Sequence, residues 1–144
     1  MKRHKSLYPF SWDHHHALVE ARRLRTAEDA RQAAEQFIEF WKKGLQNHFR
    51  EEEEILLPLF ARFTQPDRAE IVETLDQHVA IRRRINELVD HIGSGAIIDA
   101  TLLKELAESL EGHIRFEENE LFPAIESTVT EEELWRMNGR LSNR

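Results

Sequence analysis

Apolar residues recur at alternating intervals of three and four along most of the chain. This spacing is typical of helices that pack lengthwise against other helices. One such series contains Trp41, Leu45, His48, Glu52, Ile55 and Leu59, and another contains Leu103, Leu106, Leu110, His113, Glu117, Leu121 and Ala124. A third face carries Ile71, Leu75, His78, Ile85, Leu88 and Ile92, and a shorter one carries Leu18, Ala21 and Leu24. Because no segment alternates with a period of two, the sequence predicts an all-α fold.

Turn and capping signals divide the chain into four long helices and one short one. The predicted helices cover about 11–26, 27–63 with a bend near Pro58, 66–92, 99–127 and 130–141. Short connections favour antiparallel neighbours. We therefore expect a single domain over residues 1–144: an up-down-up-down four-helix bundle over about 11–127, followed by a short fifth C-terminal helix.

Composition removes several classes of function. Among the 144 residues, 20 Lys and Arg face 27 Asp and Glu, a net charge of −7, which argues against a nucleic-acid partner. The absence of cysteine excludes disulfide scaffolds, thiolate metal sites and cysteine nucleophiles. We find no apolar run long enough for a membrane span and no leader segment, so we expect a cytoplasmic protein without a membrane partner. Eight histidines remain to be explained, and histidine is the commonest protein metal ligand.

Four of the polar residues interrupt the apolar series. His48 and Glu52, and again His113 and Glu117, occupy positions that the packing pattern reserves for Leu or Ile. Residues four apart on a helix lie on the same side, so each pair directs an imidazole and a carboxylate toward the bundle axis. An unpaired buried carboxylate costs several kcal/mol. Two of them beside histidines are reasonable if a cation lies among them.

An internal repeat strengthens this interpretation. Residues 48–58 align without gaps on residues 113–123, and the His, the Arg, both Glu, the Leu and the Pro coincide. His78, followed three residues later by an aliphatic residue, matches a histidine at the start of the first helix, where helix geometry alone allows His14 or His15. Two helical hairpins related by a pseudo-twofold axis would bring six ligands to one central site. The repeated Arg50 and Arg115 are expected to pair with carboxylates that hold these ligands.

From Asp13 to about Glu126 the chain resembles the hemerythrin-like (HHE cation-binding) family. The motif His-x-x-x-Glu-Glu followed by Leu-Phe-Pro carries most of this resemblance. In the family's first-helix motif the ligand histidine stands two residues after an acidic residue and three before an aliphatic one. Here that register selects His15, with His14 or His16 able to replace or supplement it. The ligand set that the resemblance implies is His15, His48, Glu52, His78, His113 and Glu117.

The resemblance also implies a non-heme di-iron centre, in which two carboxylates bridge oxo- or hydroxo-linked irons and imidazoles are terminal ligands. The expected exogenous ligands are dioxygen, nitric oxide or peroxide, in carriage, sensing, storage or detoxification. Oxygen carriers of the family have a fifth histidine at the position of Thr74, so we expect a more open site here. A binding protein is favoured over a dedicated enzyme. The alternatives are a di-iron oxidase or oxygen-activating enzyme, and a non-metallated helical interaction module.

Overall fold

A computed structural model describes residues 2–144 of the chain. It is 83% helical, and residues 2–144 contain no strand, so the prediction of an all-helical chain is confirmed. The α-helices are α1 Tyr8–Thr26, α2 Ala30–Phe40, α3 Gln46–Glu51, α4 Leu57–Arg62, α5 Ala69–Ser94, α6 Ala100–Phe116, α7 Phe122–Thr128 and α8 Glu131–Asn138.

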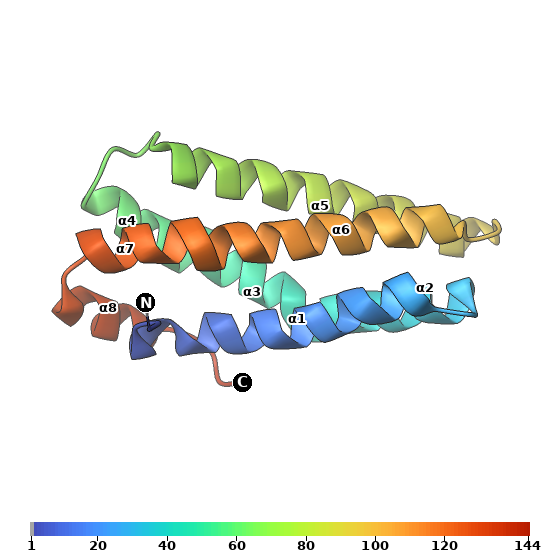
Figure 1. Ribbon diagram of the computed structural model, residues 1–144, viewed down its shortest axis with the longest axis horizontal. Coiled ribbons are helices and arrows are strands. Elements are labelled where there is room, and N and C mark those ends of the chain that lie inside the picture. Colours follow the sequence, from blue (N-terminus) through green and yellow to red (C-terminus); the bar gives the residue numbers. More distant parts are fainter. Residues whose placement is uncertain (1) are drawn as a thin grey trace.

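The long helices lie side by side as a helical bundle (Figure 1). α6 packs against both α1 and α5, and α2 contacts α1 and α5. The short helix α8 lies at the end of the bundle where α4 and α7 are found (Figure 1). Its N-terminus is capped by the Thr130 hydroxyl, which accepts a hydrogen bond from the Glu133 N–H.

The helix limits differ from the expected ones where proline and glycine act. α1 begins at Tyr8 rather than near residue 11, because Pro9 is well suited to a first helical turn. α5 begins at Ala69, three residues after Pro66, because Arg68 still has extended backbone angles. The same helix ends at Gly95, whose φ of 73° is the left-handed conformation that favours glycine at this position.

Within residues 2–144, three π-helical turns join consecutive α-helices into two long continuous helical runs. Trp41–Leu45 joins α2 to α3, Glu52–Leu56 joins α3 to α4, and Glu117–Leu121 joins α6 to α7. The last two begin at the repeated glutamates and precede Pro58 and Pro123. Proline has no N–H, and its ring clashes with the carbonyl four residues earlier in a regular helix. A widened turn relieves that clash. The sequence predicts a bend near Pro58, and the structure has this π-helical turn just before the proline.

Buried apolar side chains form two separate clusters along the bundle. The first includes Leu24, Phe37, Ile85, Leu103 and Leu110, and the second includes Phe10, Leu56, Phe60, Phe122 and Leu134. Along the helical run of α6 and α7, the first cluster ends at Ile114 and the second begins at Leu121. The buried polar residues therefore lie between two apolar regions.

Candidate metal centre

Six buried ionisable side chains meet between the two apolar clusters. Each is at most 3% exposed, and together they are His14, His48, Glu52, His78, His113 and Glu117. Their ligand atoms form two groups: His14 and His48 with both glutamates, and His78 and His113 with both glutamates. Within each group these atoms lie within 4.8 Å of one another. The two carboxylates are therefore common to both groups.

Glu117 is the centre of one set of contacts. Its Oε1 lies 2.7 Å from His14 Nε2 and 4.0 Å from His48 Nε2. Its Oε2 lies 3.3 Å from His113 Nε2 and 3.7 Å from His78 Nε2. One fully buried carboxylate thus faces the Nε2 atoms of all four histidines.

Glu52 completes the arrangement and leaves several polar atoms without partners. Its Oε1 lies 3.1 Å from His78 Nε2 and 3.3 Å from His48 Nε2. Four buried atoms of this cluster accept or donate no hydrogen bond: Nε2 of His48 and His113, and Oε2 of Glu52 and Glu117. Buried polar atoms are nearly always hydrogen-bonded. Unpartnered imidazole nitrogens and carboxylate oxygens that converge on one place fit a bound metal cation.

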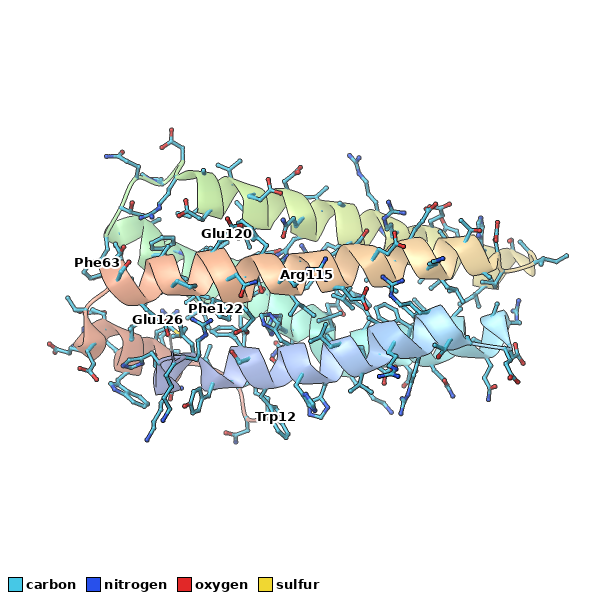
Figure 2. All side chains as sticks on the ribbon, in the orientation of Figure 1. Trp12, Phe63, Arg115, Glu120, Phe122 and Glu126 are labelled. Atoms are coloured by element: carbon cyan, nitrogen blue, oxygen red, sulfur yellow. The ribbon has the colours of Figure 1, made fainter. Side chains whose placement is uncertain are left out.

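The first-helix ligand position differs from the expected one. The structure places His14, not His15, in this cluster, because His14 is 3% exposed while His15 and His16 face solvent. The rings of His15 and His16 lie against Trp12, which is 54% exposed and projects away from the bundle (Figure 2). One residue is about 100° of helix, so a shift of one position moves the imidazole from the interior to the surface.

Thr74, at the position where oxygen carriers have a fifth histidine, is also buried. Its hydroxyl donates a hydrogen bond to the backbone oxygen of Glu70 at 2.7 Å. The side of the cluster that contains His78 therefore lacks the fifth imidazole that oxygen carriers have.

A carboxylate next to each shared glutamate fixes one histidine. Glu118 Oε2 lies 2.6 Å from His14 Nδ1, and Glu53 Oε2 lies 2.6 Å from His78 Nδ1. These contacts leave Nε2 of both rings directed at the cluster, which is the usual outer support of metal-binding histidines. Neither Glu53 nor Glu118 was identified from the sequence, although the doublet Glu-Glu recurs in both copies of the repeat.

The other two histidines are held from neighbouring helices. His48 Nδ1 lies 2.8 Å from Asp13 Oδ2, and His113 Nδ1 lies 2.7 Å from Gln77 Oε1. Asp13 and Gln77 each immediately precede a histidine of the cluster. Neither was identified from the sequence, because each contact joins residues about 35 positions apart.

The expectation for Arg50 and Arg115 is wrong. Both are exposed, and Arg50 forms only a surface pair with Glu54 at 3.7 Å. Three other arginines contact the carboxylates that hold the histidines: Arg82 with Glu53 at 2.6 Å, Arg3 with Glu118 at 3.3 Å, and Arg144 with Asp13 at 2.8 Å. They come from other parts of the chain, so helical spacing could not identify them.

The protonation of the cluster reflects this pairing. Burial alone would lower the pKa of His78, but its interactions with Glu117, Glu52 and Glu53 outweigh burial and raise the pKa to about 10. Burial alone would raise the pKa of Glu53, but its hydrogen bonds to His78 and Arg82 lower it to about 2. At neutral pH His78 is therefore protonated and Glu53 is ionised, so a cation that binds His78 Nε2 has to displace a proton.

Aromatic rings cover two of the imidazoles. The Phe49 ring lies on His78 with the centroids 3.9 Å apart and the planes 7° apart, and Phe122 lies on His14 with the centroids 5.5 Å apart. Phe49 and Phe122 are both completely buried. They fix the orientation of the rings and keep water away from this part of the bundle.

The helical fold and the buried clusters of imidazoles and carboxylates that could hold a metal ion are those of a helical metal-binding protein. The chain belongs to the hemerythrin family: the model of the hemerythrin HHE cation-binding domain matches residues 8–125, which confirms the resemblance and shows cation binding as its function. Neither a curated protein nor a solved structure was found to match the chain. Within residues 2–144, none of the helices has the length and apolar character needed to cross a membrane.

Proposed function

We propose that the chain holds two iron ions and, through them, binds dioxygen, nitric oxide or peroxide. The observation that carries the proposal is the sharing of Glu52 and Glu117 by two ligand groups, each of which adds two histidines of its own. Imidazole together with carboxylate is a donor set that suits iron. The proposed ligands are His14, His48, Glu52, His78, His113 and Glu117, with His14 in the place first assigned to His15.

Each residue has a distinct role in this proposal. Glu52 and Glu117 are the candidates to bridge the two ions, because each lies in both groups. His14 and His48 would hold one ion, and His78 and His113 the other. The up-down-up-down arrangement and the pseudo-twofold repeat are part of the proposal, because they account for this equal division of ligands between the two halves of the chain.

The number of protein ligands leaves coordination positions open for a small exogenous molecule. Two octahedral irons have about twelve coordination positions, and four imidazoles, two bridging carboxylates and one oxygen bridge fill about ten of them. When bound, the irons supply redox chemistry and open positions for a small exogenous ligand. The protein's own residues orient the imidazoles, lower the pKa of the buried Glu117 through its histidine neighbours, and exclude bulk water.

The test is iron content and the visible spectrum after anaerobic loading with ferrous iron and exposure to air. We expect two irons per chain in the wild type and in His15→Ala, one in His14→Ala, and fewer than one in Glu117→Ala. His15→Ala is the matched control, because it removes the exposed neighbour of the proposed ligand. Full occupancy in folded Glu117→Ala would contradict the proposal. A folded wild-type protein that takes up no iron would instead favour a non-metallated interaction module.

Repeated oxidation of added ferrous iron by each site would favour an oxidase. A single reversible binding event would favour carriage or sensing.

A further inference from the structure

Two histidines at equivalent positions of the repeat have chemically different partners. His48 Nδ1 is held by the carboxylate of Asp13, whereas His113 Nδ1 is held by the amide oxygen of Gln77. The Gln77 amide nitrogen donates to Glu73 Oε1 at 3.0 Å, which leaves its oxygen to accept from the imidazole of His113. One position of the site therefore has a charged acceptor where the other has a neutral one.

The remaining two histidines do not show this difference. His14 and His78 are both held by carboxylates, those of Glu118 and Glu53, at the same distance of 2.6 Å. The position formed by His14 and His48 is thus supported by two carboxylates. The position formed by His78 and His113 is supported by one carboxylate and one amide.

The acceptor at Nδ1 changes the strength of the ligand at Nε2. A carboxylate polarises the imidazole N–H more than an amide oxygen does and makes the ring a stronger donor to a metal, and removal of such a partner typically costs about 10–100-fold in metal affinity. Arg144 binds the same Asp13 oxygen that accepts from His48, at 2.8 Å, and withdraws part of its charge. The effect therefore belongs at the lower end of that range, about 10-fold.

We infer that the two cation positions are inequivalent, and that Asp13 and Gln77, acting as positioning residues, make the His14–His48 position fill first. The inference rests on the proposed two-metal site. It goes further by predicting which position fills first, which the symmetric set of ligands does not determine.

The experiment is a titration of metal-free protein with cobalt(II), followed by proton NMR of the hyperfine-shifted Nδ1–H signals. These signals are assigned with protein labelled at histidine and with single histidine variants. At one equivalent of cobalt, we expect the signals of His14 and His48 to appear ahead of those of His78 and His113. Calorimetry on the same samples should show two steps whose affinities differ about 10-fold.

Two variants test the cause of the order. Asp13→Asn should weaken the first step about 10-fold and bring the two steps together. The double variant Glu73→Gln with Gln77→Glu keeps the net charge and a hydrogen bond between the two side chains, and it should strengthen the second step. A gain of affinity cannot arise from structural damage, so this variant separates an electronic effect from loss of folding. Glu87→Gln, an exposed change on the same helix, is the control and should alter neither step.

The outcomes separate this inference from the proposal beneath it. The inference would be overturned if two cobalt ions bind and the Nδ1–H signals of all four histidines rise in proportion. It would also be overturned if the order of filling is the same in both variants as in the wild type. Either result would leave the two-metal site standing. A folded protein that binds no cobalt would overturn the two-metal proposal, and this inference with it.

Discussion

Replacement of Phe49 by alanine tests how far apolar packing holds the imidazoles in place. The Phe49 side chain is fully buried, its ring lies on His78, and its centroid is 5.3 Å from that of Trp41 in an edge-to-face contact. Truncation of a buried phenylalanine to alanine costs about 3–5 kcal/mol. Because aromatic pairs add roughly 0.5–1.5 kcal/mol each, we expect the upper half of that range, about 4–5 kcal/mol.

The measurements are urea unfolding of the metal-free variant, which gives the loss in free energy of unfolding, and thermal unfolding, which gives the melting temperature, both followed by far-ultraviolet circular dichroism. At about 2–4 °C per kcal/mol for a domain near this size, the melting temperature should fall by about 8–20 °C. Phe40→Ala is the matched control, because Phe40 belongs to the same helical run but is only partly buried. Its cost should be less than half as large.

The same variant has a second readout at the site. Loss of the Phe49 ring frees His78, whereas His14 keeps its contact with Phe122. We therefore expect weaker binding at the His78–His113 position and little change at the other. A loss of stability below about 2 kcal/mol, or one equal to that of Phe40→Ala, would refute the reasoning.

Two further predictions follow from the protonation and the packing of the bundle. The pKa values of His14, His48 and His78 are raised, so metal uptake at neutral pH should release protons, and the metal affinity should fall as the pH falls. Calorimetry in buffers of different ionisation enthalpy counts the released protons, and a count of zero would contradict this prediction. Leu103→Ala in the first apolar cluster should cost about 2–5 kcal/mol but leave the metal stoichiometry unchanged, which metal analysis of the folded variant can check.

The helices were predictable because their signals are local. A period of three and four residues, the cap at Thr130 and the glycine at Gly95 each act within one or two turns of the chain. The predicted start near residue 11 is three residues later than the observed start of α1 at Tyr8, because Ser11 and Asp13 resemble helix-capping residues. In the structure, the Ser11 hydroxyl donates to Glu118 and Asp13 accepts from His48, so neither caps the helix.

The first-helix histidine shows where the family register and the local spacing of buried residues disagree. The stripe read from Leu18, Ala21 and Leu24 includes a residue that is 40% exposed, Leu18. The residues of α1 that are buried are Phe10, His14, Ala17, Ala21 and Leu24, at alternating steps of four and three. The spacing of Ala17, Ala21 and Leu24, extended backwards, would have selected His14. The register taken from the family motif selected His15 instead.

The partners of the histidines could not be found in the same way. Asp13, Gln77 and the three arginines reach the cluster from other helices or from the chain termini, so their contacts depend on how the helices pack. The repeat fixes which face of each helix carries a ligand. It does not determine which side chain of a neighbouring helix contacts Nδ1 of that histidine. For this reason the sequence predicts nearly symmetric ligands, and the structure adds an asymmetric support.

The cluster itself is poorly explained by folding alone. Helices with leucine at positions such as 52 and 117 would pack at least as well, since replacing buried ion pairs with apolar residues is often neutral or stabilising. A network that served only to fix helix register would also satisfy its own hydrogen bonds. Instead, Nε2 of His48 and His113 and Oε2 of Glu52 and Glu117 are buried without partners, while the outward-facing Nδ1 atoms are all satisfied. Within the cluster, the four atoms that lack partners all face the shared centre, so the chemistry of a bound cation accounts for them better than the stability of the bundle does.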